Sequence, residues 1–192
     1  MHLNFSTNKE TLDAPLVEFE DNVGVSTNTN LEVVTDGCEI ICNDANLSDY
    51  CTNSSIDFTF EWIEAISING VSNLNIGGSS YSNFTNISLG SILPGDSVDY
   101  SITPGFSNTA YQEYFSVWID SNFDDVFDNS ELVISNSSNS TIAGKFAVPN
   151  FVENGTTILR VQINYDSGSD ACGSFQYGET EDYKINLGSN CN

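Results

Sequence analysis

The sequence has 192 residues, in which 27 Asp and Glu stand against four Lys and Arg, for a net charge of −23 at pH 7. This length suits one domain of ordinary size with an additional arm. The charge argues against nucleic acid, anionic lipid and other polyanions as partners, and it suits salty or calcium-rich surroundings outside a cell. Because the chain lacks an apolar run of about eighteen residues, we expect no insertion into a membrane.

Residues 1–49 are predicted to form an extended arm or linker. They contain one apolar patch, at residues 31–34, among Asn, Thr, Asp and Glu, and they lack the regular strand pattern of the rest of the chain. Simple disorder is one interpretation of this segment. The other is a strand over residues 31–41 that docks on this domain or on the sheet edge of a neighbouring molecule.

The five cysteines favour an oxidising compartment. Their spacings fit no zinc-binding pattern, and the single histidine, His2, lies near the start of the chain. Disulfide bonds explain them better, which predicts a secreted or cell-surface protein. Spacing alone does not choose among the possible pairings of Cys38, Cys42, Cys51, Cys172 and Cys191.

A long strand is predicted where apolar residues begin to alternate after residue 50. Glu64 interrupts its buried face, either as a register kink or as an inward-facing acceptor, and we favour the kink because an unpaired inward acid is costly. We expect Trp62 on this face to belong to the core. Turn residues then outnumber strand residues from Asn69 to Phe84. The apolar face consists of Ile56, Phe58, Phe60, Trp62, Ile66 and Ile68.

The remaining elements are predicted to be strands separated by turns. Leu93 to Asp96 form a turn, and Pro104-Gly105 end the strand that follows it. No segment shows the 3.6-residue apolar period of a helix. We therefore predict an all-β fold of about eight to ten strands, an antiparallel, jelly-roll-like β-sandwich over residues 50–188 with a short tail at 189–192. The later predicted strands cover residues 98–102, 112–120, 132–134, 142–148, 157–165 and 182–187.

Oxygen-bearing side chains alternate in the acidic loop, residues 120–131. Counted from Asp120 they occupy positions 1, 3, 5, 9 and 12 of an EF-hand-type loop, and the carbonyl of position 7 completes the set. Position 6, where the sharp turn favours glycine, is Asp125, which tolerates the left-handed region. Predicted strands, and not the helices of a calcium sensor, flank the loop on both sides, so we predict a structural Ca²⁺ site. The alternative is an acidic surface turn without metal. The predicted ligands are Asp120, Asn122, Asp124, Val126, Asp128 and Glu131.

A second acidic cluster lies at the start of the final strand. Glu179, Glu181 and Asp182 crowd together there, and Glu179 and Glu181 share a face if the strand has already begun. Such crowding is costly without a cation. We expect either Arg160, from a neighbouring strand, or a metal to compensate these charges, which makes the cluster a possible second acidic site.

Motifs along residues 50–188 resemble those of the GEVED domain, a module found in large secreted bacterial proteins beside peptidase, glycan-active and adhesive domains. The run Gly178 to Asp182 reads G-E-T-E-D where the family has G-E-V-E-D. Thr180 replaces the family's Val, and Asp125 replaces its Gly in the acidic loop. The other landmarks, in chain order, are Tyr50-Cys51, Tyr81 to Thr85, Pro94-Gly95, Val117 to Phe127, Val148-Pro149, Gly155 to Val161 and Cys172-Gly173.

The resemblance implies a non-catalytic β-sandwich that is exported, calcium-loaded and attached to a larger protein. It also implies a disulfide between Cys51 and Cys172. Cys38, Cys42 and Cys191 then lie outside the domain, where two of them can pair with each other and one can link chains.

Three functions compete. The first is polysaccharide binding by aromatic side chains beside the acidic clusters, and Trp118 is then either exposed to the ligand or part of a core. The second is a structural or adhesive surface or fibre subunit that self-associates through its N-terminal arm. We do not expect the third, catalysis, because acids such as Glu179 and Glu181 have no His base and no Ser or Cys has a catalytic partner. The candidate ligand-binding residues are Tyr111, Tyr114, Trp118, Phe175 and Tyr177.

Overall fold

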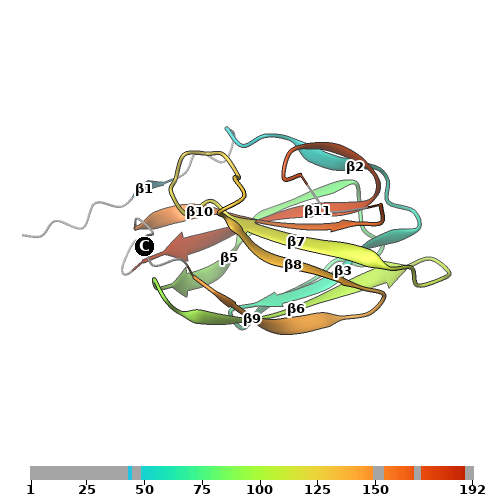
Figure 1. Ribbon diagram of the computed structural model, residues 1–192, viewed down its shortest axis with the longest axis horizontal. Helices are drawn as coiled ribbons and strands as arrows, with labels where there is room; N and C mark the ends of the chain where they lie inside the picture. Colours follow the sequence, from blue (N-terminus) through green and yellow to red (C-terminus); the bar gives the residue numbers. More distant parts are fainter. Residues whose placement is uncertain (1–42, 45–48, 149–153, 167–169, 189–192) are drawn as a thin grey trace, which may run out of the picture. The chain divides into compact units, whose positions relative to one another are not determined.

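The computed structural model describes residues 43–44, 49–148, 154–166 and 170–188, and every regular element among them is a β-strand (Figure 1). The predicted all-β class is confirmed. No helix in this part of the chain is long and apolar enough to cross a membrane. The strands are β1 (Asn43–Asp44), β2 (Asn53–Asp57), β3 (Glu61–Ile68), β4 (Val71–Leu74), β5 (Tyr81–Ile92), β6 (Ser97–Phe106), β7 (Glu113–Ile119), β8 (Leu132–Ser138), β9 (Ile142–Ala147), β10 (Gly155–Asn164) and β11 (Gly173–Leu187).

Two sheets face each other, as the predicted β-sandwich requires. The seven-stranded sheet has the order β2-β11-β10-β7-β8, with β1 paired to β10 and β5 paired to β11, and the four-stranded sheet has the order β4-β3-β6-β9. In Figure 1 the ribbons of β3, β6 and β9 run beneath those of β7, β8 and β10. Most neighbours are antiparallel, but β1–β10, β2–β11 and β5–β11 are parallel, which the sequence pattern did not predict.

The main core fills the space between the sheets. Apolar side chains at alternate positions of each strand point into it, because successive residues of a strand face opposite sides of the sheet. The seven-stranded sheet contributes Phe115, Val117 and Leu159, among others, and the four-stranded sheet contributes Ile63 and Ile102, all of them fully buried. Burial of these side chains is the main favourable contribution to folding.

The predicted kink at Glu64 is confirmed, but the long strand around it is wrong. A register shift interrupts the pairing of β3 with β6 between Ile63 and Ala65. The shift changes which positions face inward: Glu61 and Ile63 are buried before it, and Ile66 and Ile68 after it. Residues 58–60 separate β2 from β3, and these two strands lie in different sheets. The alternating apolar residues that predicted one long strand therefore belong to two separate strands. Four residues of the predicted buried face are not buried: Ile56 and Phe60 are exposed, and Phe58 and Trp62 are half-buried.

Two further predictions are wrong for local reasons. The region expected to be mainly turns, from Asn69 to Phe84, contains β4 and the start of the twelve-residue strand β5. Pro104 and Gly105 do not end β6, which continues to Phe106. Strand β9 pairs with β6 only up to Ile102, so Pro104 lies where one side of β6 has no ladder hydrogen bond to lose. The predicted turn from Leu93 to Asp96 is present, closed by the amide of Asp96 donating to the carbonyl of Leu93.

Most of the predicted N-terminal arm lies outside the described residues, including the possible strand at 31–41. The exception is β1, whose backbone pairs in parallel with residues 155 and 156 of β10. Cys38, Cys42 and Cys191 and the tail at 189–192 also lie outside the described residues, so their pairing stays open.

Candidate functional site

The acidic loop connects β7 to β8 and folds back on its own carboxylates. Asp120 accepts hydrogen bonds from the amides of Phe123, at 2.8 Å, and Asp125, at 3.1 Å. Glu131 accepts one from the amide of Ser121, at 2.7 Å, on its Oε1 atom. The first and last acids of the predicted ligand set therefore also organise the backbone of the loop, and both are buried.

Asp125 adopts the backbone conformation that its position in the loop demands. Its φ is 62°, in the left-handed region where glycine is normally favoured. Phe123 is also left-handed, with φ 60°. Asp tolerates this region better than most residues, so the substitution of Asp for Gly keeps the sharp turn.

The remaining predicted ligands stay at the surface. Asn122, Asp124 and Asp128 are exposed, and Val126 is 55% exposed. Asp124 accepts hydrogen bonds from the amide of Val126 and the side chain of Asn122, both at 3.0 Å. Among the described residues, no three Asp, Glu, His or Cys side chains converge as the ligands of one metal ion. The oxygen donors suit a hard cation chemically, but their side chains do not converge on one point in this structure. Calcium binding stays a prediction.

Tyr50 ties the acidic loop to the segment that precedes β2. Its hydroxyl donates to Asp120 Oδ2 at 2.5 Å, and its ring lies 5.1 Å from that of Phe127, between centroids. Burial, assisted by the bond to Asp120, raises the pKa of Tyr50 above its usual range, so the phenol stays a neutral donor. The Tyr-Cys motif thus has a physical role, because its tyrosine completes the hydrogen bonds of a loop seventy residues away.

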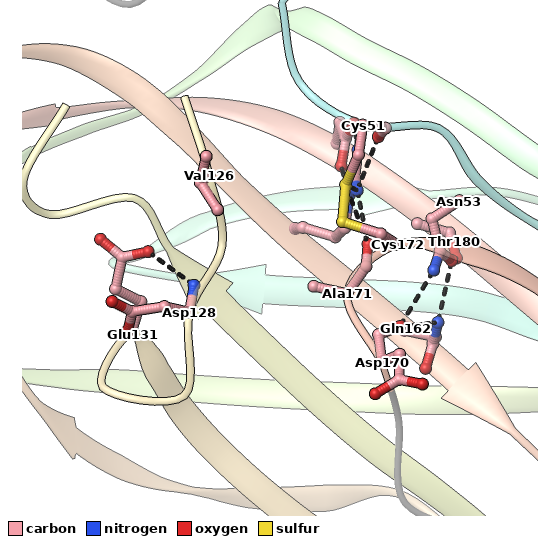
Figure 2. The surroundings of a disulfide bond; sticks show 12 residues. Cys51, Asn53, Val126, Asp128, Glu131, Gln162, Asp170, Ala171, Cys172 and Thr180 are labelled. Atoms are coloured by element: carbon pink, nitrogen blue, oxygen red, sulfur yellow. Dashed lines mark hydrogen bonds and ion pairs between the residues drawn. A yellow bond between two sulfur atoms is a disulfide. The ribbon is translucent and has the colours of Figure 1, made fainter. Parts of the chain in front are cut away.

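The predicted disulfide between Cys51 and Cys172 is present. It links two cysteines that are 121 residues apart in the sequence, with their Cα atoms 5.5 Å apart. Figure 2 shows this bond together with Asp128 and Glu131 of the acidic loop. Disulfides persist in oxidising compartments, which agrees with an extracellular environment.

Arg160 is buried beside this disulfide and donates hydrogen bonds to the backbone on both sides of it. Its guanidinium forms two parallel hydrogen bonds to Asp182, each 2.7 Å long, and donates to the carbonyls of Cys51 and Ala171 at 3.0 and 2.7 Å. It also lies 4.8 Å from the centre of the Phe127 ring. One side chain therefore connects β10, β11, the disulfide and the acidic loop.

The G-E-T-E-D run, residues 178–182, divides its side chains between the two faces of β11. Gly178 has φ 123°, and a Cβ there would overlap the carbonyl oxygen of Ile163, so only glycine fits. Glu179 and Glu181 point between the sheets, whereas Thr180 and Asp182 lie on the outer face and bond to Asn53 and Arg160 respectively. The run is thus part of the buried framework of the fold.

Protein donors compensate the two inward acids. Glu179 accepts hydrogen bonds from the amides of Ile63 and Ser79, both at 3.0 Å, and from the side chains of Asn75 and Ser82. Glu181 accepts from Asn75 at 3.0 Å and from the hydroxyl of Tyr183 at 2.7 Å. Burial raises the pKa of both groups, that of Glu181 to about 8. The expectation that Arg160 would meet these two acids is wrong, because it faces the other side of β11 and pairs with Asp182.

Residues 114–186 match the family model described as GEVED domain. The resemblance to GEVED domains is confirmed. The match covers the acidic loop and the G-E-T-E-D run, and it starts after the Tyr50-Cys51 motif. It supports the coarser expectation of an accessory module. No curated protein matches the chain.

Within the GEVED-matching stretch, Trp118 is not available to a ligand. Its side chain is 2% exposed and packs with Phe127, Ile158 and Ala171 in a second, smaller core. Of the two alternatives for Trp118, exposure to a ligand or a place in a core, the structure shows the second. The outer face of the sheet is covered here by the segments that carry Tyr50 and Ala171, which the alternation of β7 alone does not reveal.

The other aromatic candidates separate into different places. Tyr111 and Tyr177 line one surface hollow, of about 220 Å³, together with Phe60, Glu61 and Tyr165; these five residues are called the aromatic hollow below. Tyr114 is 37% exposed and lies outside this hollow. Phe175 is half-buried and lines a separate, mainly polar hollow.

Two buried acids near the aromatic hollow were missed by the sequence analysis. Glu61 and Glu113 are 2% and 0% exposed. The signal for Glu113 was present, because it lies two residues before Phe115 on the apolar face of β7. The signal for Glu61 was hidden, since the register shift in β3 reversed the expected faces.

Proposed function

We propose that this chain is a non-catalytic, calcium-stabilised binding module of a larger secreted or cell-surface protein, and that its ligand is a polysaccharide. The observation that supports the ligand is the aromatic hollow. Phe60, Tyr111 and Tyr165 are 47%, 45% and 39% exposed, and together with Tyr177 they form a continuous group of rings. Sugar rings stack their C–H faces on such side chains, while phenol and carboxyl groups bind hydroxyls.

The rings support one another in fixed orientations. The Tyr165 centroid lies 5.6 Å from that of Tyr111 and 6.2 Å from that of Tyr177, and Tyr177 lies 5.9 Å from Phe60, all edge to face. Edge-to-face packing restricts ring rotation, which lowers the entropy lost on binding. A volume of about 220 Å³ is below the roughly 300–1,000 Å³ of sites for drug-sized ligands, so we propose that it takes a single sugar unit of a chain.

A glycan array, followed by calorimetric titration with the polysaccharides that bind, tests this proposal. Tyr111→Ala and Tyr165→Ala should each weaken binding by about tenfold, a typical loss for one stacking ring. Tyr114→Ala is the matched control, since it removes an exposed tyrosine outside the aromatic hollow, and its affinity should stay within about twofold of the parent. Absence of binding to every glycan, or equal losses in all three variants, would contradict the proposal.

For the calcium ion, we propose Asp120, Asn122, Asp124, Asp128 and Glu131 as side-chain ligands and the carbonyl of Val126 as the sixth. The chemistry of these donors and the left-handed Asp125 support the proposal. A bound cation would neutralise part of the loop's negative charge and join the end of β7 to the start of β8. Because Asp124 and Asp128 are exposed, an ion would have to recruit them from the surface.

Calcium titration and thermal unfolding in calcium or EGTA test the metal site. A hundredfold excess over the dissociation constant should stabilise the fold by about 2.7 kcal/mol, and raise the melting temperature by about 5–10 °C. Asp124→Ala should abolish this shift, whereas Asp99→Ala, which removes an acid of β6 paired with Lys145, should preserve it. A melting temperature that does not respond to EGTA would refute calcium stabilisation.

The alternative, a structural or adhesive subunit, is favoured by one observation. Strand β1 already adds to β10 in parallel, so the N-terminal segment is able to extend a sheet. Size-exclusion chromatography of the chain with and without residues 1–49 separates the two proposals. A binding module should elute as a monomer in both forms, whereas a fibre subunit should lose its self-association when the segment is removed.

A further inference from the structure

Two acids close one end of the main core. Glu61 is the first residue of β3 and shares the inward face of Ile63, and Glu113 is the first residue of β7 and shares the inward face of Phe115. The two strands belong to opposite sheets, and the charge of Glu61 acts on Glu113, so the two acids lie near each other at one end of the sandwich. Apolar residues occupy the corresponding positions further along both strands.

The carboxyl groups of this pair lack the donors that such burial normally requires. Both oxygens of Glu113 are buried without a hydrogen-bond partner. Glu61 lines the aromatic hollow, and no hydrogen bond from a described residue offsets the burial that raises the pKa of its carboxyl group. Glu179, which is equally buried, accepts from four different residues. Buried polar groups are nearly always satisfied, so an unsatisfied Glu113 next to a Glu61 that lines an open hollow leaves room for a cationic partner.

Nearby negative charges further increase the cost of ionising the carboxyl groups of Glu61 and Glu113. Burial, and then the charges of Asp57 and Asp166, raise the pKa of Glu61 to about 7. Burial, and then the charge of Glu61, raise the pKa of Glu113 to about 8. Both ion pairs among the described residues involve other groups: Lys145 pairs with Asp99, and Arg160 pairs with Asp182. The negative potential of this end is therefore not compensated by a neighbouring ion pair.

Aromatic rings surround the same position. Phe60, Tyr111, Tyr165 and Tyr177 form the wall of the hollow to which Glu61 contributes. The faces of such rings attract ammonium groups, and the attraction is stronger where water is partly excluded. A carboxylate among aromatic rings is a suitable site for an organic ammonium ion, because the carboxylate pairs with the charge and the rings pack on the apolar part. A neutral sugar would use the rings but leave the acids unpaired.

We propose that the aromatic hollow binds an amino sugar, with the sugar ring packed on the aromatic wall and the protonated amine directed to Glu61. Glu113 lies behind it on the core side, and neither of its carboxyl oxygens has a hydrogen-bond partner. This inference rests on the proposed polysaccharide-binding function and specifies its ligand as a glycan with free amines. Because the whole chain is strongly acidic, the test must separate this site from general attraction of cations.

Calorimetric titration of the full chain at about 0.15 M salt provides the test, because general electrostatic attraction is screened there. The probes are a glucosamine oligomer, an N-acetylglucosamine oligomer and a glucose oligomer of equal length. We expect the glucosamine oligomer to bind at least about tenfold more tightly than the two neutral oligomers. Glu61→Gln should reduce that preference to less than about threefold. Asp99→Asn, which removes an exposed charge elsewhere, should keep it.

The possible outcomes distinguish this inference from the proposed function. Equal binding of the charged and neutral oligomers would overturn the amino-sugar inference and leave polysaccharide binding intact. Tetramethylammonium is titrated as a separate control, and if it binds while no oligomer does, both the polysaccharide proposal and the amino-sugar inference are overturned. An unchanged preference in Glu61→Gln would show general attraction and overturn the site. If Glu61→Gln fails to fold, Tyr111→Ala, at an exposed position, replaces it and must weaken binding of the glucosamine oligomer.

Discussion

Glu179 on β11 accepts a hydrogen bond from the backbone amide of Ile63 on β3, 3.0 Å away, and so joins the two sheets through the core. Strand β4 pairs only with residues 65–68 of β3, so no strand covers this side of Ile63. The carboxylate takes the place of the missing strand. A glutamate of the G-E-T-E-D run is thus an acceptor for the backbone of the opposite sheet.

Removal of this carboxylate should destabilise the fold strongly. Glu179→Ala leaves the amides of Ile63 and Ser79 and the side chains of Asn75 and Ser82 without their acceptor. Buried donors without a partner cost about 1–3 kcal/mol each, so we expect a loss of at least about 3 kcal/mol in urea unfolding. Glu179→Gln retains one acceptor oxygen and should lose less. Equal, small losses in both variants would show that the cross-sheet bonds are not important for stability.

The two ion pairs of the described residues should differ sharply in importance. Arg160→Met leaves Asp182 buried without its cation, and we expect a loss of about 3–5 kcal/mol in the free energy of unfolding. Lys145→Met breaks an exposed pair with Asp99 and should cost less than about 1 kcal/mol. Denaturant unfolding of both variants makes the comparison, and similar losses would contradict it. Asp182→Leu combined with Arg160→Met should recover part of the stability, since no buried charge then remains.

The buried pair at the end of the core predicts a loss of stability as the pH rises. In the folded state the pKa of Glu113 is about 8, against an ordinary value of 4.5. Between these values the folded protein keeps the proton and the unfolded chain has lost it, so unfolding releases a proton. The contribution of this group is fully present below about pH 4.5 and is lost as the pH rises to about 8.

Glu113→Gln tests this linkage, because the amide does not titrate. From pH 5 to pH 8 the parent should lose on the order of 1–3 kcal/mol relative to the variant. Glu181, whose pKa is also raised, contributes to the slope in both proteins and cancels in the comparison, whereas the interaction of Glu113 with Glu61 is part of the measured difference. Urea unfolding at several pH values measures the difference. Parallel curves for the two proteins would mean that Glu113 does not bind a proton more tightly in the folded state.

Reduction of the Cys51–Cys172 disulfide should lower the stability of the whole sandwich. The bond closes a loop of about 120 residues, and loops of that length correspond to a loss of about 2–5 kcal/mol. Thermal unfolding with and without a reducing agent measures the effect. With a reducing agent present, the double variant Cys51→Ser, Cys172→Ser should melt at the temperature of the reduced parent. A parent that is insensitive to reduction would show that the surrounding bonds of Arg160 suffice.

Much of the local structure could be predicted from the sequence. The turn at Leu93 to Asp96 and the kink at Glu64 follow from short-range rules, because proline, glycine and an inward acid act on their immediate neighbours. The left-handed conformation of Asp125 follows from its position in the acidic loop. The pairing of Cys51 with Cys172 came from the resemblance to GEVED domains and not from spacing.

Contacts between distant segments could not be predicted in this way. Alternation shows that Glu179 and Asp182 lie on opposite faces of β11, but it does not show what covers each face. Ile63 meets one acid and Arg160 the other only because β3 lies in the opposite sheet and β10 lies beside β11. The sequence left Trp118 undecided for the same reason, since the segment around Tyr50 covers a face that the strand pattern leaves open.

By itself, the sequence determined the all-β class, the positions of the oxygen donors in the acidic loop and the order of the motifs, because these depend on neighbours along the chain. Only the tertiary structure decided that the G-E-T-E-D acids are satisfied by protein donors and that Glu61 and Glu113 are not. Hydrogen-bond satisfaction depends on which segments, far apart in the sequence, bring donors to a buried carboxylate. That information lies in the packing of the two sheets.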